Sequence, residues 1–565
     1  MAFGAASPFV VEREGAHVLP PAAAAAGGDS MRFIRLQERN FAAAGRRLIV
    51  VLAALALSAI LPGPTQGQQT EAGPTTTKAR IARAEQLRRA GNLPAARQEL
   101  ELALKAAPNL AQAHLDLGMV EYQMGETTPA IAHLRRAAEL LPNSFEAHYG
   151  LAMACLHEQK TDEGIHELER ARAIDPRHPD AAYNLGIILL GRGKAAESER
   201  LFRETRALGQ NRPDVSFYLI YAELEQRRFD DAAREAAESA QAFGSDAAWQ
   251  TNVGRLFLEH HQSRAAQPHL EEALRLDPGS AEARRLLAAA RLDLREPAAA
   301  LEALPSAATA EDHYLRASAF YFLRRYRESH EECETALAAA PREPKYLLLA
   351  ARVAQRVGDH DGAIAMLERA EAAAPQWAEP YCSQGVSYYL QRRYEDARRM
   401  LARALELDPQ SSRALFLSAA VLVNQGKNRE AEEYFRRALA LEPANARFHY
   451  QYGGLLLRDN RAEEAQKAFE EAVRLQPGYA PPHYQLGKLL VRASQPASAA
   501  RELEAAVRID PALPQAYYQL SRAYTLLGEK EKAAQALATF NQLKKQQTDD
   551  EQEFIEGIRK DVEAP

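Results

Sequence analysis

Small and apolar residues recur along the chain with a fixed spacing of 34 positions. Segments begin at residues 77, 111, 145, 179, 213, 247 and 281, and after one segment shortened to 29 residues the step resumes at 310, 344, 378, 412, 446, 480 and 514. Counted from the start of each segment, position 8 is small in thirteen of fourteen copies and position 20 is always Ala, Gly or Ser. A fixed period of this length is typical of stacked supersecondary repeats.

Two further positions indicate what each repeat contains. Position 24 often carries a large apolar residue, such as Leu401 or Phe435, which we expect to fill the space that the small residues leave where two helices cross. Position 32 is proline in ten copies, including Pro108 and Pro409. Proline cannot continue a helix, so it predicts the end of the second helix in each copy. The pattern therefore predicts fourteen helix pairs.

The copy at residues 378–411 is the clearest, and it resembles a tetratricopeptide repeat. Its residues match all eight signature positions of that family: Tyr381, Gly385, Tyr388, Tyr394, Ala397, Leu401, Ala404 and Pro409. The resemblance extends over residues 77–547. It implies an all-α solenoid in which antiparallel helix pairs wind into a right-handed superhelix with a concave groove. It also implies protein binding rather than chemistry.

The pattern divides the chain into four parts. Residues 1–76 form an N-terminal extension, residues 77–309 a block of seven repeats whose last copy is shortened, and residues 310–547 a second block of seven. The shortening predicts a hinge at residues 304–309. Thr548 begins a capping-box spacing, and apolar residues then recur every fourth position, so we expect a separate capping helix at residues 548–565.

The N-terminal extension contains an apolar run at residues 48–61, preceded by Arg46 and Arg47 and ended by Pro62. Fourteen helical residues span roughly 21 Å, which is shorter than a hydrocarbon core of about 30 Å. This favours a cleaved export signal, with a periplasmic or extracellular product. A retained membrane anchor is the alternative. The true start can be Met1 or Met31.

Composition narrows the classes of function. The chain is 47% hydrophobic with a formal net charge of −6, which gives no general attraction to nucleic acid. Cys155, Cys333 and Cys382 are too far apart in sequence for a zinc or redox motif. The repeats leave no room for a catalytic domain. We therefore expect no enzyme activity, no metal site and no cofactor.

In the family, the first helix of each repeat lines the groove, and position 5 is aromatic in eight copies of this chain. These residues are Tyr149, Tyr183, Phe217, Tyr314, Phe416, Tyr450, Tyr484 and Tyr518. They fit two interpretations. They can pack between repeats, or they can form a row that contacts a bound peptide.

Charge at positions 2, 9 and 13 differs between the two blocks. The second block carries basic residues there: Lys345, Arg352, Arg356, Arg413, Arg447, Arg458, Lys488, Arg492 and Arg522. The first block is mainly acidic at the same positions, for example at Glu146, Asp214 and Glu282. We expect a polarised groove whose C-terminal half binds an acidic segment. The alternative is that these charges only keep an exposed helix face soluble.

The sequence as a whole predicts a non-catalytic scaffold or adaptor that binds partner segments, in an exported or envelope complex. A cytosolic or membrane-tethered cochaperone-like adaptor is the alternative. Family members that grip a C-terminal carboxylate carry Lys or Arg at position 5, whereas this chain has mostly apolar or aromatic residues there. A clamp for chaperone tails is therefore not expected.

Overall fold

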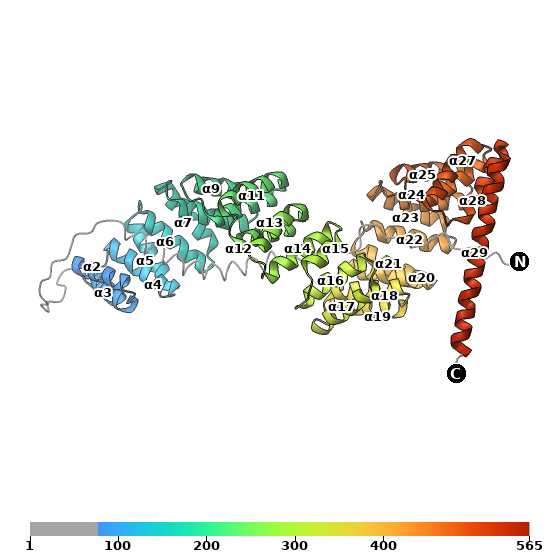
Figure 1. Ribbon diagram of the computed structural model, residues 1–565. Helices are drawn as coiled ribbons and strands as arrows, with labels where there is room; N and C mark the ends of the chain where they lie inside the picture. Colours follow the sequence, from blue (N-terminus) through green and yellow to red (C-terminus); the bar gives the residue numbers. More distant parts are fainter. Residues whose placement is uncertain (1–76, 564–565) are drawn as a thin grey trace. The chain divides into compact units, whose positions relative to one another are not determined.

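The computed structural model describes residues 77–563 as 28 α-helices, α2 to α29, most of which are labelled in Figure 1. Side chains are described for residues 77–546. Consecutive helices pair within each of the two units into which the chain divides. The all-α prediction, with antiparallel helix pairs, is confirmed. The predicted signal segment at residues 48–61 lies outside the described residues.

From α4 onward, the first helix of every repeat begins at the residue that the 34-residue pattern predicts. The first helices are α2 (Thr77–Arg89), α4 (Ala111–Gln123), α6 (Phe145–His157), α8 (Pro179–Gly191), α10 (Pro213–Glu225), α12 (Ala247–Glu259), α14 (Ala281–Asp293), α16 (Ala310–Phe322), α18 (Pro344–Val357), α20 (Ala378–Leu390), α22 (Ser412–Asn424), α24 (Ala446–Arg458), α26 (Ala480–Arg492) and α28 (Pro514–Leu527). The predicted register is therefore correct.

The second helices follow after short turns, and most end just before the proline at position 32. They are α3 (Leu93–Ala106), α5 (Thr127–Leu140), α7 (Thr161–Ile174), α9 (Ala195–Ala207), α11 (Phe229–Phe243), α13 (Ser263–Leu276), α15 (Pro297–Ala303), α17 (Tyr326–Ala339), α19 (His360–Ala373), α21 (Tyr394–Leu407), α23 (Asn428–Leu441), α25 (Ala462–Leu475), α27 (Pro496–Ile509) and α29 (Lys530–Glu563). In α21 the helix ends two residues before Pro409, as the missing N–H of proline requires.

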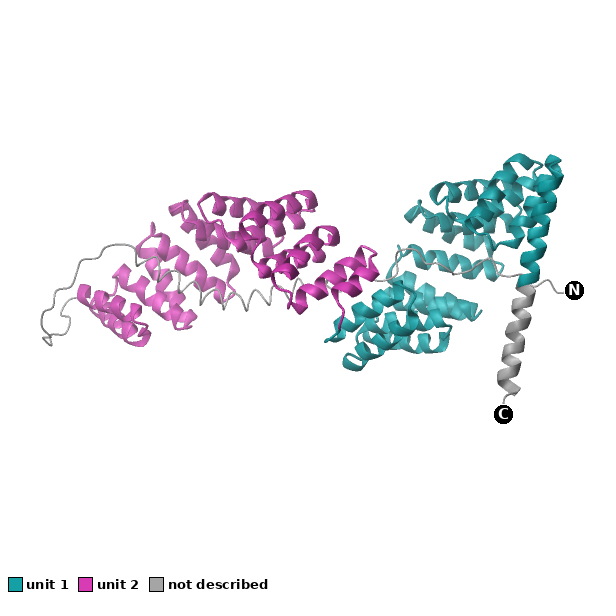
Figure 2. Ribbon diagram, viewed as in Figure 1, with its two compact units in different colours: residues 1–16, 307–565 teal, residues 17–306 magenta. Residues whose placement is uncertain are grey.

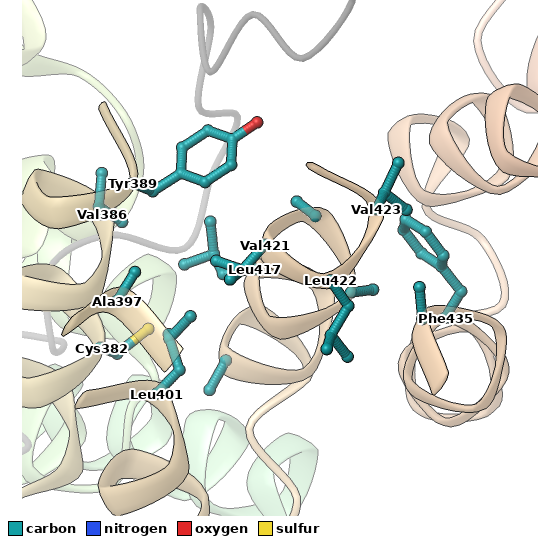
Figure 3. Close-up of a cluster of buried hydrophobic side chains, with 14 of the residues drawn as sticks. Cys382, Val386, Tyr389, Ala397, Leu401, Leu417, Val421, Leu422, Val423 and Phe435 are labelled. Carbon is teal, nitrogen blue, oxygen red and sulfur yellow. The ribbon is translucent and has the colours of Figure 1, made fainter. Parts of the chain in front are cut away.

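The two helices of a repeat cross where small and large residues face each other. A Cβ added to Gly385 in α20 would lie 2.7 Å from Cγ of Leu401 in α21, and both Leu401 and Ala397 are fully buried. Figure 3 shows these side chains in one cluster with Cys382 and Val386 of α20. The predicted complementarity of small and large positions is confirmed.

The turn between the two helices has one conformation throughout. The residue at position 15 is left-handed in every repeat. It is glycine at residues 91, 125, 193, 358, 426 and 528, and otherwise one of Gln159, Arg227, His261, Arg295, Arg324, Arg392, Asn460 and Ser494. Glycine takes this conformation without steric cost, whereas other residues pay about 1–2 kcal/mol. The sequence pattern did not predict this turn.

The chain forms two compact units, which meet in sequence between residues 306 and 307 (Figure 2). Their described parts are residues 77–306, the N-terminal unit, and residues 307–563, the C-terminal unit. The division falls three residues before the predicted block boundary, because α15 ends at Ala303 and a capping box at Thr309 and Asp312 starts α16. The hinge at residues 304–309 stays a prediction.

The prediction of a separate capping helix at residues 548–565 is wrong. Helix α29 runs without interruption from Lys530 to Glu563, so Thr548 lies inside a helix and does not begin one. Position 32 of the last repeat is Lys545 rather than proline. With no proline to remove a backbone donor, the second helix of the last repeat simply continues.

Candidate functional site

The side chains that the sequence assigns to the groove lie on the first helices, at repeat positions 2, 5, 9 and 13. We call the surface that these positions form the first-helix face. First helices of neighbouring repeats contact each other directly, for example α4 with α6, α20 with α22 and α26 with α28. The face therefore continues from one repeat to the next in these places.

Two of the eight aromatic residues at position 5 are buried and cannot contact a ligand. Tyr149 is 6% exposed, and its hydroxyl oxygen accepts a hydrogen bond from Nδ2 of Asn184 at 2.9 Å. Tyr314 is 4% exposed, and its ring stacks on Tyr346 with centroids 5.0 Å apart. For these two residues the structure supports the packing interpretation.

Three more aromatics are partly buried and held by neighbours. The Tyr183 hydroxyl donates to Oδ2 of Asp214 at 2.7 Å. Phe416 stacks on Phe448 with centroids 4.6 Å apart. Phe217 makes an edge contact with the following residue, Tyr218. The contacts of Tyr183 and Phe416 join adjacent repeats, whereas that of Phe217 lies within α10.

The remaining three aromatics are Tyr450, Tyr484 and Tyr518, in the last three repeats. Burial raises the pKa of Tyr450, and a hydrogen bond with Gln485 of α26 lowers it. Tyr484 is half-buried, whereas Tyr518 is 43% exposed although its ring lies 5.4 Å from that of Phe540. Exposure of this row therefore increases toward the last repeat.

Three basic residues of α18 and α22 form ion pairs within the protein. Arg352 is only 2% exposed, and its Nη2 lies 2.5 Å from Oε1 of Glu379. Arg413 also bonds Glu379, and Nζ of Lys345 lies 2.7 Å from Oε2 of Glu311. The prediction that Arg352 faces a ligand is wrong, because a carboxylate in the next repeat holds it in the interior.

Arg356, also in α18, contacts a tyrosine of the preceding repeat. Arg356 donates through Nε to the hydroxyl oxygen of Tyr321 at 3.1 Å, and its guanidinium lies over that ring. Tyr321 therefore orients Arg356, whereas ion pairs neutralise Lys345, Arg352 and Arg413 in the same region.

The first helices of the last three repeats, α24, α26 and α28, carry basic residues and contain no Asp or Glu. Arg458, Arg492 and Arg522 are exposed, and no carboxylate of residues 77–546 lies within 4.0 Å of Lys488, Arg492 or Arg522. Burial lowers the pKa of Lys488, and the charge of Arg492 lowers it further. Lys488 is therefore a partly desolvated cation that lies close to a second cation, Arg492.

Two arginines at the edge of this region also contact the protein. Arg458 donates to the carbonyl oxygen of Val423 at 3.5 Å. Arg447 lies close enough to Tyr479 for its charge to lower the pKa of that hydroxyl, against the larger effect of burial, which raises the pKa to about 12.

The acidic positions of the N-terminal unit are largely paired. Glu282 bonds Arg255 of the preceding repeat, and Oδ1 of Asp214 lies 3.2 Å from Nε of Arg212. Glu225 accepts from Nε2 of His260 at 3.2 Å, and this hydrogen bond lowers the pKa of Glu225. The predicted contrast between the two blocks is therefore smaller in the structure than in the sequence.

A histidine at position 4 links neighbouring repeats, which the sequence analysis missed. In α26, Nδ1 of His483 lies 2.8 Å from Oε2 of Glu502, and Nε2 lies 3.0 Å from the carbonyl oxygen of Pro477 in the preceding repeat. The hydrogen bond with Glu502 raises the pKa of His483. His148 has the same two kinds of partner in α6. The spacing of 19 residues between His and Glu is a signal that could have found them.

Buried ionisable groups elsewhere contribute no site. Burial raises the pKa of Cys333 to about 12, and it raises those of Glu121 and Glu223 to about 7. Across residues 77–546, no group of three His, Cys, Asp or Glu side chains could hold a metal ion. Among the described helices, none is both long enough and apolar enough to cross a membrane.

Family models described as tetratricopeptide repeat match most of the described chain. One model matches residues 81–145, 115–182, 253–312, 314–376, 418–480 and 484–542, and two others match residues 156–216 and 378–411. The chain belongs to the tetratricopeptide-repeat family. No catalytic domain is identified in this tetratricopeptide-repeat protein.

Several solved structures are similar to this tetratricopeptide-repeat protein. The Cut9–Hcn1 hetero-tetramer of APC/C is 14% identical over 80% of this chain and 96% of that chain, with a TM-score of 0.39. PilF of Pseudomonas aeruginosa is 29% identical over 29% of this chain and 75% of its own, with a TM-score of 0.28. The human IFIT1 dimer is 16% identical over 65% of this chain and 90% of its own, with a TM-score of 0.40. No curated protein sequence matches the chain.

Proposed function

We propose that this tetratricopeptide-repeat protein is a non-catalytic scaffold that holds segments of partner proteins on its first-helix face. The observation that carries the proposal is that different repeat positions serve packing and exposure to solvent. In the repeats at residues 446–479 and 480–513, positions 8, 20 and 24 are buried where the helices cross, whereas Arg458, Arg492 and Arg522 at positions 9 and 13 of the last three repeats are exposed. Tetratricopeptide repeats typically mediate protein–protein interactions.

We also propose that the scaffold works after export, in an envelope or extracellular complex. The support is the sequence of residues 46–61, in which two arginines precede an apolar run too short to span a hydrocarbon core. N-terminal sequencing of the mature protein tests this proposal. A start near Gln68 supports export with cleavage, whereas an intact chain in the cytosol contradicts it.

Site-specific photo-crosslinking in the organism of origin tests the scaffold. A photoreactive amino acid replaces Tyr484 or Tyr518 on the first-helix face, and Lys467 or Arg501 on the second helices of neighbouring repeats as matched exposed controls. We expect the same partner protein to crosslink from Tyr484 and Tyr518 and not from the controls. Crosslinks only from Lys467 and Arg501 would place binding on the opposite side of the repeats.

A further inference from the structure

The last three repeats carry three parallel stripes of side chains on their first helices. Positions 5, 9 and 13 are spaced by four residues, so each stripe lies along one side of its helix, with steps of about 6 Å. The stripes are Tyr450, Gly454 and Arg458 in α24, Tyr484, Lys488 and Arg492 in α26, and Tyr518, Arg522 and Leu526 in α28. We call these nine residues the tyrosine–basic patch.

The patch is cationic without compensation from its own helices. Helices α24, α26 and α28 carry no acidic residue, and no carboxylate of residues 77–546 lies within 4.0 Å of Lys488, Arg492 or Arg522. Arg458 also belongs to the patch, and it donates to the carbonyl oxygen of Val423. Lys488 and Arg492 are four residues apart on one helix, where like charges repel. An anionic ligand would relieve this repulsion and gain more than it would on a neutralised surface.

The patch also offers apolar contact area. Tyr518 is 43% exposed and Leu526 is 57% exposed, at opposite ends of the stripe on α28. At Gly454 no atom lies within 4 Å of the place that a Cβ would occupy, so the middle of the α24 stripe is open. Aromatic and basic residues together are the types enriched at the energetic centres of protein interfaces.

We propose that the tyrosine–basic patch binds an extended acidic segment of a partner protein. Neighbouring helices lie about 8–10 Å apart, and an extended chain advances about 3.3 Å per residue. One repeat therefore corresponds to about three residues of the ligand. The segment would carry a carboxylate at about every third residue, facing the cations, with apolar side chains between them against Tyr450, Tyr484 and Tyr518.

A protein ligand fits better than a nucleic acid. The formal net charge of the whole chain is −6, and the positive charge is confined to a few side chains beside exposed apolar ones. Nucleic-acid surfaces usually show a broad basic footprint. A segment that mixes carboxylates with apolar side chains matches both components of the patch. This inference rests on the proposed scaffold function and specifies its ligand.

Fluorescence anisotropy with a defined probe tests the proposal. The probe is a labelled nine-residue peptide, blocked at both ends, that repeats Glu-Leu-Ser three times, and its control has Gln in place of each Glu. We expect the Glu peptide to bind the full chain more tightly than the Gln peptide, and to bind more weakly as salt rises. Equal binding of the two peptides would overturn the proposal.

Two charge-reversed variants separate the patch from general electrostatics. The first combines Lys488→Glu, Arg492→Glu and Arg522→Glu, and the matched control combines Lys467→Glu, Arg501→Glu and Arg508→Glu on the second helices. Both change the net charge by the same amount. We expect at least a tenfold loss of affinity for the Glu peptide only in the first variant, with unchanged helix content by circular dichroism. Equal losses in both variants would overturn the proposal.

Three further outcomes would assign the patch to another ligand and overturn the proposal. One is tighter binding of single-stranded RNA than of the Glu peptide, lost in the first variant. Another is tighter binding of phosphatidylserine vesicles than of the Glu peptide, again lost in the first variant. The third is a change of oligomeric state by light scattering in the first variant alone. A partner that still crosslinks to Tyr484 in the first variant would show that its binding does not need the three cations, which would overturn the proposal of an acidic ligand and leave the scaffold function standing.

Discussion

Two adjacent glycines in α24 allow a direct test of how closely the two helices of a repeat cross. A Cβ added to Gly453 would lie 2.7 Å from Cε1 of Phe469 and 2.9 Å from its Cδ1, whereas a Cβ at Gly454 would meet no atom within 4 Å. We predict that Gly453→Ala destabilises the repeat and that Gly454→Ala stabilises it.

The size of the effect follows from what the two substitutions share. Both replace glycine by alanine inside the same helix, which is favourable by about 1 kcal/mol. Only Gly453→Ala adds a methyl group to a filled space, and overpacking typically costs about 1–3 kcal/mol. Phe469 is fully buried, so its ring cannot turn into solvent to make room. We expect the two variants to differ by about 1–3 kcal/mol, with Gly453→Ala the less stable.

Native-state hydrogen exchange of the full chain is the appropriate assay. A repeat array does not unfold as one cooperative unit, so a single midpoint would average over distant repeats. Exchange reports the free energy of local opening for each helix, and we expect the amides of α24 and α25 to respond. Equal or greater protection of these helices in Gly453→Ala than in Gly454→Ala would refute the proposed close crossing.

Three further predictions concern single positions. Ala397→Leu adds volume at a fully buried crossing, so we expect exchange protection to fall at residues 378–411 and to stay unchanged in distant repeats. Arg392 has a φ of 59°, a left-handed conformation that glycine adopts without steric cost, so we expect Arg392→Gly to stabilise its turn by up to about 1 kcal/mol. Slower thermal unfolding of this variant supports the prediction, and faster unfolding contradicts it. The raised pKa of His483 means that its stabilising effect is complete below the unfolded value of about 6.5 and disappears as pH rises through the folded value. Exchange protection of α26 should therefore be greater at about pH 6 than at about pH 9, and His483→Gln should remove that difference.

The sequence predicted helix starts well because stacking imposes the same packing on every copy. Small residues where two helices cross, and proline after a helix, determine the structure within a single repeat. The helix bounds can therefore be predicted from the sequence of each repeat alone. The end of the chain was predicted wrongly, because the polar spacing at Thr548 looks the same inside a helix as at its beginning.

The basic surface was only partly predictable, because its charges depend on pairs between repeats. Arg352 and Glu379 are 27 residues apart, and Arg413 and Glu379 are 34 apart, so each lies beside the other across a repeat boundary. Counting the basic and the acidic residues at each repeat position separately misses such pairs. Comparing positions at separations of 27 and 34 would have removed Lys345, Arg352 and Arg413 from the predicted surface.

Helix contacts within each unit stay close in sequence. Over the described residues, extensive contacts join a helix only to the next helix or to the one after it. Such short-range topology makes the entropy cost of closing each loop small and favours rapid folding. The nascent chain can therefore acquire its native contacts in order during synthesis, with each new repeat completing the buried surface of the one before it. Only the most recently made repeat then exposes its apolar side to other proteins.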